Sequence, residues 1–102
     1  MGGYSMGISK AIILNTGDNT ATALEEIAPD AILDLPGEPD MVAVSIKQSI
    51  PLGHKFATRD ISMGEVVLKY GEVIGVASQD IEIGEHVHIH NIESVRGRGD
   101  KT

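Results

Sequence analysis

The sequence predicts a small, mainly β domain with one short helix near its N-terminus. Three observations support this: short apolar runs bounded by Gly, Pro and Asp, a turn pattern that recurs in the second half, and a single stretch with helical spacing. The chain has 102 residues, enough for one domain with a modest core. Aromatic residues make up only 3% of it, so Ile, Val, Leu and Ala must fill most of that core.

Strands and one helix are expected in the first half. Three short apolar runs are typical of strands, at residues 11–14, 32–35 and 41–46. The helix is predicted over residues 20–27, where Ala23, Leu24 and Ile27 fall at helical spacing. Its N-terminus would be capped by the polar side chains of Asp18, Asn19 and Thr20. Pro29 bounds the helix on its other side.

The second half repeats one turn pattern. The pattern Ile-x-apolar-Gly-x-x-apolar begins at Ile50, Ile61 and Ile81. The last two copies are preceded by Asp60 and Asp80 and carry Glu after the glycine. A glycine at a fixed position predicts a turn with a backbone conformation that is costly for other residues, followed by a strand. Between the last two copies, residues 66–70 and 73–77 flank a Gly-Glu pair, which predicts a hairpin with a type II′ turn.

Composition excludes several classes of function. Fifteen acidic and eight basic residues give a net charge of -7, which disfavours nucleic acid and anionic membranes as partners. The chain has no cysteine, so disulfide scaffolds and thiolate chemistry are excluded and a cytoplasmic location is expected. No apolar run approaches the roughly 20 residues of a membrane span. Phosphate-binding loops, nucleophile elbows and dinucleotide fingerprints are also missing.

Three of the four histidines, His86, His88 and His90, occupy alternate positions. On a strand they would share one face, because successive side chains point to opposite faces. Imidazole is the commonest neutral metal ligand and titrates near physiological pH. The row therefore indicates a metal site, a polar site or a partner surface.

Strand geometry limits how many of these imidazoles can bind one ion. At about 3.3 Å per residue, His86 and His90 would stand about 13 Å apart, too far for one ion with bonds of about 2.1 Å. An adjacent His-x-His pair, about 6.6 Å apart along the strand, can converge. Three interpretations stay open: a complete metal site, a half-site completed by another chain, or histidines hydrogen-bonded to their neighbours.

His54 and Lys55 form a second group of interest. As functional groups they would place a proton-transfer group beside a cation able to hold a substrate carboxylate. As structural residues, His54 would belong to a turn and Lys55 to an exposed strand position. The spacing alone does not decide between these two interpretations.

Several segments match the pattern of a known family. They are Ile50-Pro51-x-Gly53-His54-Lys55-Phe56-Ala57, Asp60-Ile61-x-x-Gly64, Lys69-Tyr70-Gly71 and Asp80-Ile81-x-x-Gly84-Glu85-His86-Val87-His88-x-His90-Asn91. They closely resemble the N-terminal SAF-type domain of the altronate/galactarate dehydratase family and the small subunit of the related sulfolactate sulfo-lyase. The resemblance implies a SAF-type β-clip fold over residues 10–95. The glycine-rich composition of the N-terminus predicts a disordered segment at 1–9, and residues 96–102 are expected to form a polar tail.

The resemblance also implies a function. Members of this family eliminate water, or sulfite, from a hydroxy sugar acid or a related carboxylate, assisted by a divalent metal such as iron. A larger C-terminal portion carries much of the enzyme, so this chain is expected to work as a small subunit or N-terminal domain with a large catalytic partner, and not alone. Self-association into a homo-oligomer is also compatible with the resemblance.

Carried over by position, the family pattern assigns roles to named residues. His54, Lys55 and His88 are candidate catalytic residues, and Lys55 and Asn91 are candidate substrate ligands. His86, His88 and His90 are candidate metal ligands, with at most an adjacent pair on one ion. Other functions stay open: a stand-alone β-clip module that binds a small sugar or carboxylate without catalysis, the small subunit of a sulfolactate sulfo-lyase, or a structural assembly domain.

Overall fold

A computed structural model of the chain describes residues 10–13, 15, 17–36 and 41–94. These ranges contain β1 (Ala11–Ile12), β2 (Thr20–Ala23), β3 (Ile32–Pro36), β4 (Met41–Ser45), β5 (Lys55–Ala57), β6 (Val66–Lys69), β7 (Glu72–Ala77), β8 (His86–Val87) and β9 (Ile92–Glu93). The fold is therefore mainly β, as predicted, and the described part contains no helix. In particular, no helix of these residues is long and apolar enough to span a bilayer. The disordered segment predicted at 1–9 and the polar tail predicted at 96–102 lie outside the described residues.

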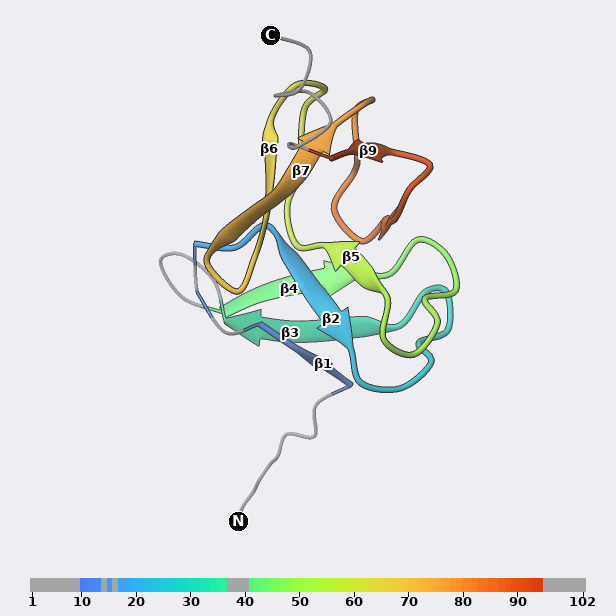
Figure 1. Cartoon of the computed structure of the whole chain (residues 1–102). Coiled ribbons are helices and arrows are strands. Elements are labelled where there is room, and N and C mark those ends of the chain that lie inside the picture. Colours follow the sequence, from blue (N-terminus) through green and yellow to red (C-terminus); the bar gives the residue numbers. More distant parts are fainter. Residues whose placement is uncertain (1–9, 14, 16, 37–40, 95–102) are drawn as a thin grey trace, which may run out of the picture.

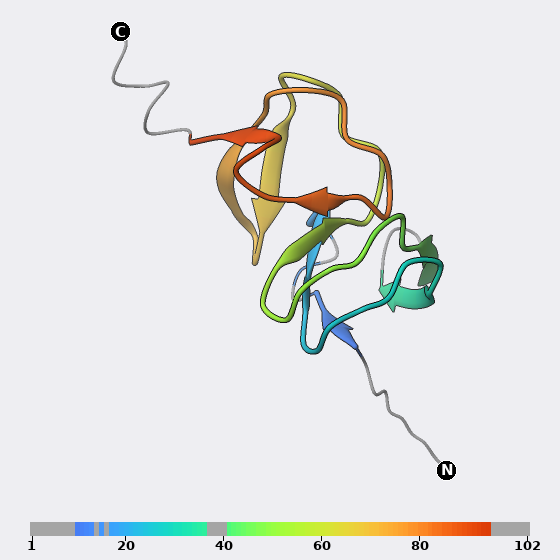
Figure 2. The ribbon, with the colours of Figure 1, turned by 90° about the vertical axis from the view of Figure 1, so that its right-hand side faces the viewer.

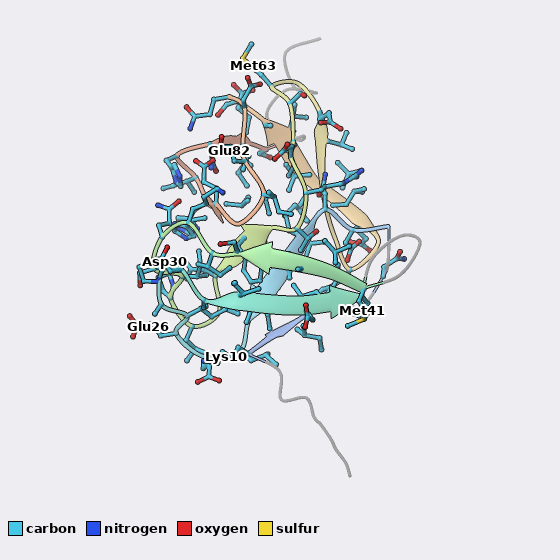
Figure 3. All side chains as sticks on the ribbon, turned by 180° about the vertical axis from the view of Figure 1, so that it is seen from behind. Lys10, Glu26, Asp30, Met41, Met63 and Glu82 are labelled. Atoms are coloured by element: carbon cyan, nitrogen blue, oxygen red, sulfur yellow. The ribbon has the colours of Figure 1, made fainter. Side chains whose placement is uncertain are left out.

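The strands form three antiparallel sheets. The largest has the order β1-β2-β5-β8, β3 and β4 form a separate ribbon, and the third sheet has the order β6-β7-β9. In Figure 1 the β3–β4 ribbon crosses behind β1 and β2, and the β6-β7-β9 sheet lies at the other end of the molecule. Figure 3, seen from behind, shows no other strand over the outer face of the ribbon.

The core divides into two hydrophobic clusters. The first includes buried side chains of the four-stranded sheet and of the β3–β4 ribbon, with Phe56 and Val44 fully buried. The second includes Val67, Ala77 and Val87, from β6, β7 and β8. Apart from Phe56, the buried hydrophobic residues in the described part are all Ile, Val, Leu or Ala, which confirms the prediction made from composition.

The helix predicted over residues 20–27 is wrong. Thr20–Ala23 form β2, which pairs with both β1 and β5. Alternation of β-branched Thr with Ala suits a strand that is buried in a sheet. Leu24 is half exposed, and Ile27 is buried where it bridges Ile50. The apolar positions that matched helical spacing therefore do not share one face.

The side chains expected to cap that helix bind the backbone of β6 instead. The Asn19 amide donates to the Val66 carbonyl at 2.9 Å and accepts from the Leu68 N–H at 2.7 Å. The Thr20 hydroxyl donates to the Leu68 carbonyl at 2.8 Å. Both polar residues are almost fully buried. Asn and Thr side chains can hydrogen-bond either to the first turn of a helix or to the backbone of a distant strand. The local sequence does not distinguish these two possibilities.

The β6–β7 hairpin turns at Tyr70 and Gly71, so the predicted type II′ turn at Gly71-Glu72 is wrong. Glu72 pairs with Lys69 and belongs to β7. Positive φ angles at both Tyr70 (55°) and Gly71 (78°) define a type I′ turn. The Asp18 carboxylate accepts the N–H groups of both turn residues, at 2.7 and 2.8 Å. These two bonds hold Tyr70 in a conformation that is uncommon for a bulky residue.

The repeated turns are confirmed, and their glycines all have positive φ, at Gly53 (84°), Gly64 (92°) and Gly84 (88°). The copies at Ile61 and Ile81 face each other through an antiparallel bridge. Their preceding aspartates cap each other's turns: Asp60 accepts the Ile83 N–H and Asp80 accepts the Met63 N–H, both at 2.9 Å. The two copies are thus related by an approximate two-fold symmetry.

A fourth copy of the turn begins at Ile27, and the sequence pattern missed it. Ile27 bridges Ile50 as Ile61 bridges Ile81. Asp30 takes the glycine position, with φ of 73°. Asp tolerates this left-handed conformation better than most residues, so the pattern does not require glycine there. Two pairs of facing turns therefore organise the fold. His54 follows a turn of one pair and His86 follows a turn of the other.

Candidate functional site

Strands β5 and β8 lie side by side (Figure 2). Three imidazoles meet at this junction. The antiparallel register pairs Lys55 with Val87 and Phe56 with His86. Extending that register by one residue places His54 opposite His88. Pairing between segments that are more than thirty residues apart in sequence thus brings His54 to the other two histidines.

The imidazoles of His54, His86 and His88 lie against one another. The rings of His54 and His88 are stacked with centroids 4.5 Å apart, and His86 stacks on His54 at 5.1 Å and on His88 at 5.3 Å. Nδ1 of His54 lies 2.9 Å from Nε2 of His86, so one of these two nitrogens carries the proton and the other accepts it. One ring nitrogen from each histidine falls within 4.8 Å of the others. All three side chains are partly exposed.

This cluster differs from the straight row that alternation predicts. Strand β8 ends at Val87, and the chain turns over residues 88–91. His86 and His88 still converge, as expected for an adjacent pair. The third imidazole comes from His54 of the same chain and not from His90. His90 is exposed and its ring is tilted against His86, with centroids 5.6 Å apart. Its role as a metal ligand stays a prediction.

Burial and mutual repulsion lower the pKa of two of these imidazoles. The pKa of His86 is lowered first by burial and then by the neighbouring His54, His88 and other cationic groups. Burial also lowers the pKa of His88, followed by the effect of His54 and of Lys55. Both rings are therefore neutral at pH 7, the form that acts as a metal ligand or as a proton acceptor.

Lys55 adds positive charge to the same cluster. Its ammonium group acts on both His86 and His88, since it contributes to the lowered pKa of each. Burial lowers the pKa of Lys55 itself, and the charge of Lys69 lowers it further. Lys69 in turn lies over the ring of Tyr70, with Nζ 5.0 Å from the centroid. Lys55 and Lys69 thus contribute positive charge to this part of a chain whose net charge is -7.

Asn91, a predicted substrate ligand, is fully buried. Its side-chain oxygen accepts the His88 N–H and its amide nitrogen donates to the His86 carbonyl, both at 2.9 Å. Both polar atoms of the amide are thus already bonded to backbone, and its role toward substrate stays a prediction. Sequence reasoning missed Gln48, whose side-chain oxygen accepts the His86 N–H at 3.1 Å. No local pattern signals this contact, because the two residues lie 38 positions apart.

The donor set fits a divalent metal ion of intermediate softness. Imidazole suits zinc, iron, copper and nickel, and three histidines leave an open coordination position, as in catalytic zinc sites. Two nitrogens bound to one zinc ion lie at most about 4.2 Å apart, twice the bond length. The three ring nitrogens lie within 4.8 Å of one another, which is slightly more than this limit. The side chains would therefore have to rotate toward one another to bind one ion.

Comparison with known families agrees with these features. The sequence profile of the altronate/galactarate dehydratase SAF domain matches residues 9–95. The chain belongs to this SAF-domain family. This membership confirms the family indicated by the sequence motifs.

Relatives of this SAF domain include parts of larger enzymes. The chain is 40% identical over 83 residues to an altronate dehydratase of Bacillus subtilis, with 81% of the chain and 16% of that protein aligned. It is 43% identical over 74 residues to an altronate dehydratase of Escherichia coli, which covers 72% of the chain and 14% of the relative. The chain thus spans about a seventh of the length of these two enzymes.

A third relative is a separate subunit. The chain is 49% identical over 51 residues to the (2R)-sulfolactate sulfo-lyase subunit alpha of Chromohalobacter salexigens, which covers 50% of the chain and 54% of that subunit. Regions similar to this chain therefore occur both within long altronate dehydratase chains and in a separate sulfo-lyase subunit.

Proposed function

We propose that this SAF domain supplies one part of the active site of a hydroxy-acid dehydratase of the altronate dehydratase type. In this proposal it acts as a small subunit or N-terminal domain and requires a large catalytic portion. The observation that carries the proposal is the meeting of His54, His86 and His88. Three imidazoles that lie against one another, all partly exposed, form an arrangement that ordinary strand packing does not require.

Elimination of water from a hydroxy acid needs three kinds of assistance. A base removes the proton next to the carboxylate, an acid or metal helps the hydroxyl group to leave, and a cation holds the carboxylate. We assign the carboxylate to Lys55, whose charge is close enough to contribute to the lowered pKa of His86 and His88. A metal ion bound by His54, His86 and His88 would act as a Lewis acid toward the substrate oxygens, and iron is the ion that we propose.

Proton transfer is an alternative role for the imidazoles. His54 and His88 remain the proposed catalytic histidines if no ion binds, since their rings are stacked and the pKa of His88 is lowered. An imidazole whose pKa is lowered is unprotonated at neutral pH and can therefore accept a proton directly. The two roles are distinguished by a titration of the isolated chain with Co²⁺, an ion whose absorption spectrum reports histidine coordination.

The large catalytic portion is proposed from the relatives. The two altronate dehydratases extend far beyond the aligned region, and the sulfo-lyase relative is named as a subunit. The imidazole cluster is partly exposed, so a second protein surface can approach it and supply the remaining groups of the active site.

A chimera tests this function directly. The matched region of the Bacillus subtilis altronate dehydratase is replaced by this chain, and altronate dehydration is measured with and without added Fe²⁺. We expect activity in the chimera, and loss of that activity when His86 and His88 are both changed to Ala. Full activity of that double variant would overturn the site assignment. The matched control is His90→Ala, because His90 lies outside the group of three.

A second candidate function is the elimination of sulfite from a sulfonated hydroxy acid. The 49% identity to a sulfolactate sulfo-lyase subunit favours it. The same imidazoles and Lys55 would serve this reaction, because sulfite and hydroxide leave from equivalent positions. Assays of both substrates with the same chimera separate the two. Binding of the acid without any turnover would instead support a stand-alone binding module.

A further inference from the structure

Asn91 connects the backbones of two histidines of the cluster. Its side-chain oxygen accepts from the N–H of His88, and its side-chain nitrogen donates to the carbonyl of His86. Its own N–H donates to the His88 carbonyl at 3.0 Å, and its carbonyl accepts the N–H of Ser78 at 2.9 Å. Asn91 has no exposed surface, so water does not compete for these bonds.

These bonds matter because His88 lies outside the strand ladder. Strand β8 pairs with β5 only at His86 and Val87. The N–H of His88 is bonded to Asn91, three positions further along the chain. The Asn91 amide therefore fixes the turn that brings the ring of His88 back onto His54, at a centroid distance of 4.5 Å.

We propose that Asn91 is a positioning residue whose amide sets the placement of His86 and His88 and so the affinity of the cluster for a divalent cation. The inference rests on the proposed metal-binding function. An amide is required because the two backbone groups need one acceptor and one donor at the same time. An aspartate of the same shape would offer only acceptors and would repel the His86 carbonyl. Partners that orient metal ligands in this way typically change metal affinity about 10–100-fold when they are lost.

The chain contains a matched control for this residue. Asn19 is also buried, with 1% of its surface exposed. Its amide likewise donates to one carbonyl and accepts from an N–H two residues further on, at Val66 and Leu68. That bridge is on β6, which contributes no histidine. Substitutions at Asn19 and Asn91 should therefore destabilise the fold for the same reason, but only those at Asn91 should alter the cluster.

The test compares Asn91→Asp and Asn91→Ser with Asn19→Asp and Asn19→Ser in the whole chain. Thermal unfolding without metal measures stability, and titration with Co²⁺ measures affinity and the absorption spectrum of the bound ion. We expect lower melting temperatures at both positions, and about 10-fold or greater loss of Co²⁺ affinity only at Asn91. Equal affinity loss at both positions, or folded Asn91 variants that bind Co²⁺ like the unchanged protein, would overturn the inference. The serine variants keep a hydroxyl acceptor and provide folded protein if the aspartate variants do not fold.

A metal-free measurement separates this inference from the proposed function. Proton nuclear Overhauser contacts between the rings of His54 and His88 report the stacked arrangement directly. We expect these contacts in the unchanged protein and in the Asn19 variants, and their loss in the Asn91 variants. If the unchanged protein binds no Co²⁺ and the ring contacts still depend on Asn91, the metal-binding function fails and the positioning role stands. If the contacts persist in folded Asn91 variants, the positioning role fails.

Discussion

Nδ1 of His54 lies 2.9 Å from Nε2 of His86, across the junction between β5 and β8. This contact joins two repeats of the fold, because His54 follows the glycine of one turn and His86 follows the glycine of another. The pairing of two repeats thus creates a cluster of imidazoles that neither repeat contains alone.

Replacing His54 by Ala is expected to weaken the binding of Co²⁺ or Zn²⁺, because a direct ligand is removed. The loss should exceed the roughly 10–100-fold that is typical when a residue that only orients a ligand is removed. Isothermal titration of the isolated chain measures this change. His90→Ala is the control, since His90 also contacts His86 but lies outside the group of three. Equal losses for the two variants would contradict the proposed ligand set.

The metal-free protein is expected to lose stability as the pH falls below about 6.5. The pKa values of His86 and His88 are lowered from 6.5 in the folded protein, so between the lowered values and 6.5 the unfolded chain binds more protons than the folded one. Stability therefore falls as the pH falls through this window, and above 6.5 these groups have no effect. Melting temperatures measured from about pH 8 to about pH 5 test this.

The variant His54→Gln provides the comparison for that experiment. After burial, the charge of His54 is the largest cause of the lowered pKa of both His86 and His88. Its removal should raise both pKa values toward 6.5 and reduce the dependence of stability on pH. Direct titration of the ring protons by NMR would show the same shift. A steeper pH dependence in the variant would rule out this explanation.

Much of the fold could be predicted from the sequence because its turns carry a strong local signal. Glycine at a positive φ angle is easily recognised at Gly64 and Gly84, where Asp and Glu flank it. The turn with Asp30 was missed, because Asp is common in many other conformations. The false helix at 20–27 has a related cause: polar side chains that bind a distant strand look like helix caps when only neighbouring residues are known.

The candidate site was predictable only in part. The alternation of histidines predicted that the side chains of His86 and His88 converge, and their rings do lie close together. The participation of His54 depends on the register between β5 and β8, which is set by long-range packing and not by any local pattern. The burial of Asn91 is equally non-local, since it depends on how the turn after β8 packs against the rest of the domain.

Two glycines offer a test of how tightly the turn before β8 is packed. Gly64 and Gly84 have similar φ angles of 92° and 88°. A Cβ atom at Gly64 would meet nothing within 4 Å, whereas one at Gly84 would lie 1.9 Å from the Ser45 carbonyl oxygen. Gly64→Ala should cost about 1–2 kcal/mol from backbone strain alone. Gly84→Ala should cost about 1–3 kcal/mol more because β4 must move.

Chemical denaturation of the two glycine variants measures this difference. The Gly84 variant is also expected to weaken Co²⁺ binding, because Gly84 lies two residues before His86 and its carbonyl accepts the Lys47 N–H. The Gly64 variant should bind Co²⁺ normally. Similar free energies of unfolding for both variants would show that the backbone at Ser45 moves away easily from the Cβ atom added at Gly84.

The contact with a large catalytic portion is expected to involve exposed apolar residues that lie near the clustered histidines in the sequence. Leu52 lies in the turn before His54 and is 65% exposed, and Ile89 lies next to His88 and is 82% exposed. Met63 takes the position of Leu52 in another repeat and is 68% exposed, but its turn carries no histidine (Figure 3). Leu52→Ser and Ile89→Ser should each weaken association about tenfold, while Met63→Ser should not, because anchors near the centre of an interface carry most of its energy.

Association can be measured with the large portion of the Bacillus subtilis altronate dehydratase, expressed without its matched region and added to this chain. Surface plasmon resonance gives the dissociation constant, and unfolding of each variant verifies that the fold is intact. Weaker binding by the Met63 variant as well would mean that the contact surface is broader than the cluster. Unchanged binding by both the Leu52 and the Ile89 variants would place the partner on another face. Because these side chains are exposed and contribute little to the core, a loss of association in folded protein can be assigned to the interface itself.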